Sequence, residues 1–135
     1  MPRRTRSPAH RTVTGSTTVH VTGVFSQGMP LTECDAHVTL PAERIERGEI
    51  VLRVADIWNL DVLAGDLLIV ARRGNGRAAT GEFVVATLHD LTFVGRWWGK
   101  HGARALLDDE FHVIVNAPEL RVFGAVTLIA RAETR

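Results

Sequence analysis

The stretch Leu52 to Val70 reads LRVADIWNLDVLAGDLLIV. It begins and ends in short apolar runs, and Ala64-Gly65-Asp66 lies directly before the second run. Glycine next to aspartate is typical of a turn, and a short apolar run after a turn indicates a buried strand. The stretch therefore predicts two strands joined by an irregular segment that contains Trp58.

Strand patterns dominate the rest of the chain. Apolar and polar residues alternate in TVHVTGVF, and the dipeptides Asn75-Gly76 and His89-Asp90 are turn signals between later apolar runs. Only PAERIERGE, residues 41–49, has a helical pattern, with a proline in its first turn and a glycine near its end. We expect a mainly β domain, rolled or barrel-like, with one short helix. The remaining expected strands are Ile50 to Val54, Leu67 to Ala71, Phe83 to Leu88, Leu91 to Trp98, Val113 to Val115 and Val122 to Ile129.

Length and composition favour a single soluble globular domain. The chain has 135 residues, of which 45% are apolar, and its formal net charge is +1. No apolar run approaches the roughly 18 residues of a membrane span, and the basic start lacks the apolar segment of a secretory signal. Cys34 has no second cysteine to pair with, which is in keeping with a reducing cytoplasm.

The N-terminus is basic. Its first eleven residues contain Arg3, Arg4, Arg6 and Arg11 and no acid. Segments rich in Arg, Pro, Ser and Thr rarely pack, so we expect residues 1–22 to be a flexible arm and residues 23–135 to be the folded domain. The arm predicts at most weak contact with nucleic acid phosphates. No helix-turn-helix pattern precedes the β region, which argues against sequence reading of DNA.

Four ordered pieces of the chain resemble the LexA/UmuD family, and the ending is most similar to UmuD. They are FSQGMPLTECDAHVTLPAERI, AGDLLIV, GEFVVATLHDLTFVGRW and LRVFGAVTLIAR, within Val24 to Arg131. The resemblance implies a mainly β domain, usually dimeric, that cuts its own Ala-Gly or Cys-Gly bond when a RecA filament stimulates it. UmuD-like members serve a translesion DNA polymerase.

The catalytic residues of that family are missing here. The family uses a serine nucleophile and a neutral lysine as base. The resemblance puts the serine slot near Trp58, the lysine slot near Gly95 and the cleavable bond at Gln27-Gly28. The chain holds three serines, which all precede that bond, and one lysine, five residues beyond its slot. They are Ser7, Ser16, Ser26 and Lys100.

Substitute chemistries have weaker support. Thr92 or Thr87 could act as a nucleophile with His89 or His112 as base, although threonines are common in strands. Cys34 and His37 are two ligand types without the second pair that a zinc site needs. The acids in LLDDEFH, residues 106–112, are better explained as a solvated turn. We therefore expect no cofactor and no metal.

The tryptophans are expected either to pack in the protein core or to bind a partner. Trp97 and Trp98 are adjacent on an expected strand, so they point to opposite faces and form a candidate partner-binding site. Trp58 is expected to help fill the vacated catalytic cleft or to pack in the core.

Three functions follow from these observations. The first is a non-catalytic UmuD-like accessory protein of the DNA-damage (SOS) response, a cytoplasmic homodimer that binds a translesion polymerase, with a RecA filament as a further partner. The others are the dimerisation domain of a LexA-like or phage-repressor-like transcription regulator, and a noncanonical self-cleaving peptidase. For the dimer, we expect the strand Val122 to Ile129 to contribute an edge.

Overall fold

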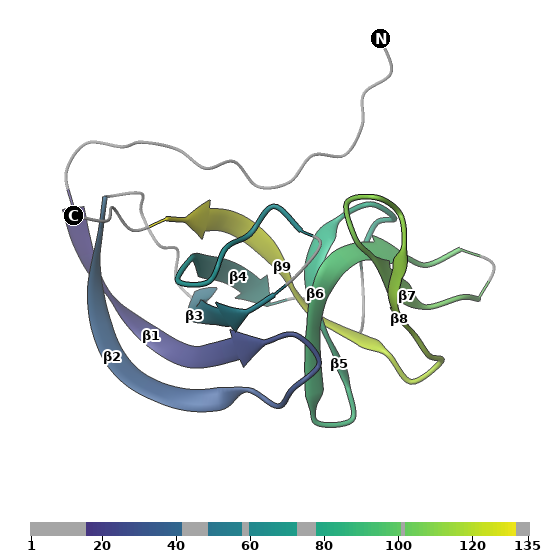
Figure 1. The fold of residues 1–135 in the computed structure, drawn as a ribbon, viewed down its shortest axis with the longest axis horizontal. Coiled ribbons are helices and arrows are strands. Elements are labelled where there is room, and N and C mark those ends of the chain that lie inside the picture. The colour runs from purple at the N-terminus through teal and green to yellow at the C-terminus, as the bar shows by residue number, and fades with distance from the viewer. Residues whose placement is uncertain (1–15, 42–48, 58–59, 73–77, 101, 132–135) are drawn as a thin grey trace, which may run out of the picture.

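A computed structural model describes residues 16–41, 49–57, 60–72, 78–100 and 102–131 (Figure 1). Within these ranges the chain forms strands, turns and bends and no helix, which confirms the mainly β prediction. The strands are β1 (Ser16–Ser26), β2 (Thr32–Pro41), β3 (Glu49–Asp56), β4 (Leu67–Arg72), β5 (Phe83–Leu88), β6 (Leu91–Trp98), β7 (Ala105–Leu107), β8 (Val113–Asn116) and β9 (Arg121–Ala130).

All nine strands belong to one mixed sheet. Its order is β2-β1-β3-β4-β9-β5-β6-β7-β8, so β2 and β8 are the two edges. The pairing of β1 with β3 is parallel and every other pairing is antiparallel. The sheet curls strongly, and the end of β1 comes to lie beside β6 (Figure 1).

The main core lies inside this curl. Its buried side chains come from all six strands between β1 and β6 in the sheet order, which explains why these strands are apolar on their inner faces. A second cluster is formed by buried side chains of β1, β3 and β4, with partly buried residues of β2 and β9 packed against it. A third contains buried side chains of β5, β6, β7 and β9. Members of the main core include Phe25, Leu52, Val54, Leu68, Val70, Val85, Val94, Val126 and Ile129.

The position of β9 corrects one expectation. β9 pairs with β4 on one side and with β5 on the other, so it lies in the middle of the sheet. Its backbone groups are used inside the chain, and the predicted edge at Val122 to Ile129 is wrong. A long apolar closing strand is explained here by burial between two neighbours.

The predicted short helix is not supported. Residues 42–48 of the expected helix lie outside the described residues, and its two end residues, Pro41 and Glu49, belong to β2 and β3. The expected N-terminal arm also differs at its end, because β1 begins at Ser16. Residues 1–15 of that arm lie outside the described residues. In the described ranges, no helix is long and apolar enough to cross a membrane.

Candidate functional site

The turn between β1 and β2 is bonded to two strands that are distant in sequence. The Gln27 N–H donates to the carbonyl of Asp56 over 2.9 Å, and the Gly28 N–H donates to the carbonyl of Thr92 over 2.9 Å. The Thr92 N–H in turn donates to the carbonyl of Met29 over 2.9 Å. Gly28 has φ 78°, a conformation that glycine adopts without steric cost. The bond that the family resemblance makes cleavable is therefore held between β3 and β6.

The side chain of Gln27 continues this attachment. Its Nε2 donates to the Val94 carbonyl over 2.9 Å, and its Oε1 accepts the Val94 N–H over 2.8 Å. Gln27 is 4% exposed, so these bonds form away from water. The primary amide thus pairs with β6 as a neighbouring strand would, and it closes the seam between β1 and β6. In the sequence, Gln27 is only a polar residue before the turn glycine Gly28, and nothing there indicates that its side chain joins β1 to β6.

A side chain in the lysine slot would be tightly crowded. A Cβ at Gly95 would lie 3.0 Å from Ile114 Cδ1, 3.0 Å from the Leu107 carbonyl oxygen and 3.2 Å from Leu106 Cβ. Two of these neighbours belong to β7, which is paired to β6 at this level. Glycine at position 95 is therefore explained by the close approach of β7 and β8.

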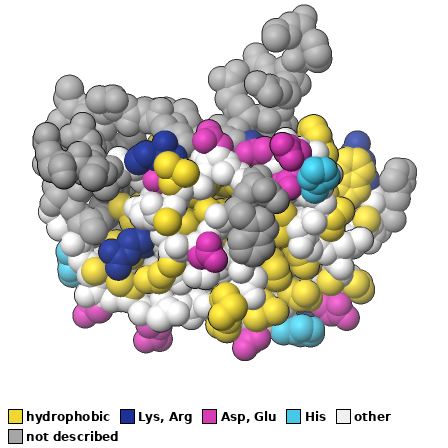
Figure 2. All heavy atoms as spheres, in the orientation of Figure 1, with side chains coloured by type: hydrophobic (Ala, Val, Ile, Leu, Met, Phe, Trp, Pro, Cys, Tyr) yellow, Lys and Arg dark blue, Asp and Glu magenta, His cyan; other side chains and the backbone are white. Residues whose placement is uncertain are grey.

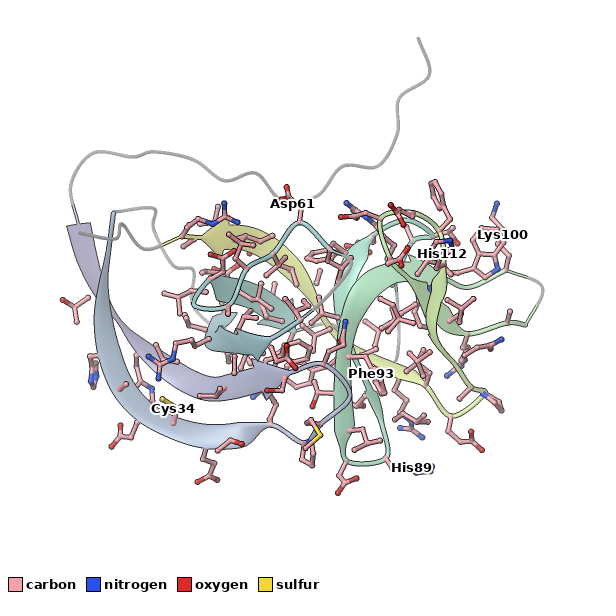
Figure 3. All side chains as sticks on the ribbon, in the orientation of Figure 1. Cys34, Asp61, His89, Phe93, Lys100 and His112 are labelled. Atoms are coloured by element: carbon pink, nitrogen blue, oxygen red, sulfur yellow. The ribbon has the colours of Figure 1, made fainter. Side chains whose placement is uncertain are left out.

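The remaining parts of the family dyad are not assembled. Trp58 lies outside the described residues, so its expected role in filling the cleft stays a prediction. Ser26 directly precedes Gln27, and Ser16 is at the start of β1. Lys100 is exposed, and its Nζ lies 5.3 Å from the centre of the Trp98 ring. Figure 3 shows Lys100 well away from Phe93 on β6.

The threonine and histidine alternative has no geometry to support it. Thr92 is buried beneath the turn, and Thr87 is its direct neighbour on β5. His89 lies at the tip of the β5–β6 hairpin, far from His112 (Figure 3). Among the described residues, no hydrogen bond joins either threonine hydroxyl to a histidine.

Cys34 and His37 do not form a pair. An odd separation along β2 sends the two side chains to opposite faces. The Cys34 sulfur lies 4.0 Å from Arg53, whereas the His37 ring lies 5.0 Å from the ring of His20. In the part of the chain that the structure describes, no three His, Cys, Asp or Glu residues form a group that could hold a metal ion.

The acidic segment at residues 108–112 forms a turn that is held by hydrogen bonds to Asp108. The Asp108 carboxylate is 2% exposed and accepts the N–H groups of Glu110 over 2.8 Å and His112 over 2.9 Å. Burial raises the pKa of Asp108, but these backbone hydrogen bonds and the nearby His112 outweigh it, and the pKa lies below its ordinary 3.8. Phe111, in this turn, has φ 65° and is 79% exposed.

Asp66, in the turn that opens β4, has a structural role that sequence reasoning missed. It is 2% exposed and accepts two hydrogen bonds from Arg131, both 2.9 Å long, together with the N–H of Leu63. Hydrogen bonding to Asp66 raises the pKa of Arg131. A bidentate ion pair between Asp66 and Arg131 therefore links the turn before β4 to the residue after β9.

The two adjacent tryptophans point to opposite faces. Trp97 is 6% exposed and packs in the third cluster, while Trp98 is 38% exposed. Trp98 is thus the one whose ring a partner could reach.

No protein-family model matches the chain, and a search of curated proteins also finds no match. The geometry by itself gives a peptide turn bonded into a curled sheet, with Ser26 directly before Gln27 and with Lys100 well away from β6 at Phe93. Such an arrangement can hold a peptide, but the described residues provide no nucleophile and base to cut it.

Proposed function

We propose that this protein is a non-catalytic, LexA/UmuD-like accessory protein of the DNA-damage response. It acts as a cytoplasmic homodimer and binds a translesion DNA polymerase or the machinery that recruits it. A RecA filament is a further expected partner. Direct contact with nucleic acid is weak and limited to the basic N-terminal arm.

The juxtaposition at the β1–β2 turn is the observation that carries this proposal. The resemblance marks three separate positions: the bond Gln27-Gly28, a serine slot near Trp58 and a lysine slot near Gly95. In the fold, Gln27 is bonded to Asp56, which precedes the first slot, and to Val94, which precedes the second. If the fold descends from a self-cleaving protein, the cleavable bond, the serine slot and the lysine slot must lie close together. A chance similarity of short motifs would not bring these three positions together.

The loss of chemistry supports a binding role. The chain has one lysine, Lys100, two residues past the end of β6, and β7 and β8 crowd the lysine slot itself. A frame that still holds the peptide but does not cut it can act only through the surfaces that it presents. Of the two tryptophans that the structure describes, Trp98 is the one available for such contacts.

Affinity capture tests this function. The tagged full chain is recovered from DNA-damaged cells, with nuclease added to remove bridging DNA. We expect a translesion polymerase to be retained, and undamaged cells provide the control. Retention of a specific DNA fragment without a polymerase, in samples without nuclease, would instead favour the transcription-regulator alternative. Retention of neither would contradict the proposal.

Binding to RecA is tested separately with purified components. The chain is sedimented with RecA filaments formed on single-stranded DNA, and a sample without filaments is the control. We expect the chain to pellet with the filament and to stay intact. A chain that remains wholly in the supernatant removes RecA from the list of partners but leaves the polymerase proposal standing.

A further inference from the structure

The two edges of the sheet differ in how they face solvent. Along the part of β2 whose side chains the structure describes, residues 32–37, the exposed side chains are polar or charged: Thr32, Glu33, Asp35 and His37. Charged side chains blunt an edge strand against pairing with another chain. β8 is paired only with β7, and its first residue, Val113, is 60% exposed. The edge at β8 therefore lacks the protection that the edge at β2 has.

Exposed apolar side chains gather around β8. Besides Val113, Phe111 is 79% exposed in the turn before β8, and Trp98 is 38% exposed on β6. Figure 2 shows hydrophobic side chains over this end of the sheet, next to acidic side chains, a histidine and a basic side chain. We refer to Phe111, Val113 and Trp98 with the outer edge of β8 as the β8 surface.

Phe111 is held in a strained conformation. A φ of 65° is unfavourable for a bulky aromatic residue, yet the Asp108 carboxylate bonds the N–H groups on both sides of Phe111, and the Phe111 N–H donates to the Asp108 carbonyl over 3.1 Å. The turn thus has a backbone held by hydrogen bonds and presents an exposed ring. Rigid aromatic anchors are the side chains that contribute most to protein interfaces.

We propose that β8 pairs antiparallel with β8 of a second copy of this chain and that the β8 surface is buried at the contact. This inference rests on the homodimer of the proposed function. A two-fold axis between Ile114 and Val115 places Val113 opposite the second copy's Asn116. Trp98, Ala105 and Asn116 are consecutive partners across β6, β7 and β8, so the second copy's Val113 extends that row.

The charges around β8 favour a second copy over an unrelated partner. The N-terminal end of β8 follows the acidic turn of Asp108, Asp109 and Glu110. Near its C-terminal end lie two basic residues, Arg104 and Arg121, and one acid, Glu119. Antiparallel pairing brings the acidic end of one copy to the basic end of the other. A two-fold interface must be self-complementary in this way.

The test measures the oligomeric state of the full chain by sedimentation over a wide range of concentration. We expect the wild-type chain to be a dimer. Val113→Arg and Phe111→Gly should each weaken dimerisation by about tenfold or more, as expected for central interface residues. Phe111→Gly should leave the melting temperature of the monomer unchanged or raised, because glycine relieves the strained φ. Met29→Arg is the control, since Met29 is 55% exposed but lies on the β1–β2 turn.

A charge exchange makes the test specific for self-association. Glu110→Lys and Arg104→Glu should each weaken the dimer, and the double variant should recover it. A wild-type chain that stays monomeric overturns both this surface and the homodimer of the proposed function. A dimer that is insensitive to Val113→Arg and Phe111→Gly overturns the β8 surface alone.

Discussion

The side chain of Gln27 makes two hydrogen bonds to β6 that a neighbouring strand would otherwise make. Its amide bonds both the N–H and the carbonyl of Val94 inside the protein. We predict that Gln27→Ala lowers the free energy of unfolding by about 2–4 kcal/mol, because it leaves two buried backbone groups without partners. Urea denaturation measures the change, with Ser26→Ala as the control. A loss below about 0.5 kcal/mol, the range of neutral surface changes, would show that the seam is held by the turn backbone alone.

Asp108 gives the protein a pH dependence. Its pKa in the fold lies below 3.8, so its ionised form stabilises the fold fully above that pH, and the contribution is lost as the pH falls through the folded pKa. Asn at position 108 still accepts the two N–H groups but carries no charge. We predict that Asp108→Asn is less stable than wild type at pH 7.

The gap between the two proteins should narrow as the pH falls below 3.8. Denaturation at a series of pH values measures it, and Asp90→Asn, at an exposed position on the β5–β6 turn, is the control. A gap that stays constant into strong acid would mean that the charge of Asp108 has no part in holding the turn.

At the scale of elements, β9 is the strand whose role changed most between expectation and structure. Its apolar run was expected to be a dimer edge, but β4 and β5 pair with both of its sides. A continuous apolar run is compatible with an edge that a partner covers and with a central strand, because both are buried on their faces. Only the pairing partners distinguish the two cases.

The close approach of β9 to β4 predicts a severe effect at Gly124. A Cβ there would lie 2.6 Å from the Ala71 carbonyl oxygen and 2.7 Å from Val70 Cγ1. Neither backbone can move without disturbing the sheet, so we predict that Gly124→Ala costs about 1–3 kcal/mol of stability. Thermal or urea unfolding measures the loss, and Arg121→Ala at an exposed position of the same strand is the control. Equal stability of the two variants would show that β4 and β9 tolerate separation here.

Two strands were not expected from the sequence. β2 alternates between inward Cys34 and Ala36 and the outward polar residues, but cysteine and alanine are weak strand signals. β7 has three residues, too few to show a period. Both strands form because a neighbouring strand pairs with them, and that neighbour is brought by the tertiary structure.

At the scale of the whole molecule, the arrangement predicts that the chain does not cut itself. Incubation with RecA filaments, or at alkaline pH, should leave Gln27-Gly28 intact, because no serine follows that bond and Lys100, the one lysine of the chain, lies five residues beyond its slot. Mass spectrometry checks for a fragment that begins at Gly28. Such a fragment in a preparation free of other proteases would refute the non-catalytic assignment.

Restoring the family residues should also fail. In Trp58→Ser with Gly95→Lys, the Cβ of the new lysine would lie 3.0 Å from the Leu107 carbonyl oxygen. We predict no cleavage and a less stable fold, measured by mass spectrometry and denaturation of the same samples. Gly95→Ala provides the steric control. Efficient cleavage by the double variant would show that β7 and β8 can yield and that the catalytic geometry survives.

The sequence by itself determined the fold class and most strands, because alternating and short apolar runs between turn residues have few other solutions. It also determined that the family dyad is missing, since that depends only on which residues the chain contains. The tertiary structure decided which strands are edges, why position 95 is glycine and that Gln27 joins β1 to β6. These features depend on contacts between segments tens of residues apart, as in the bond from Gln27 to Val94, and no local pattern encodes such distances.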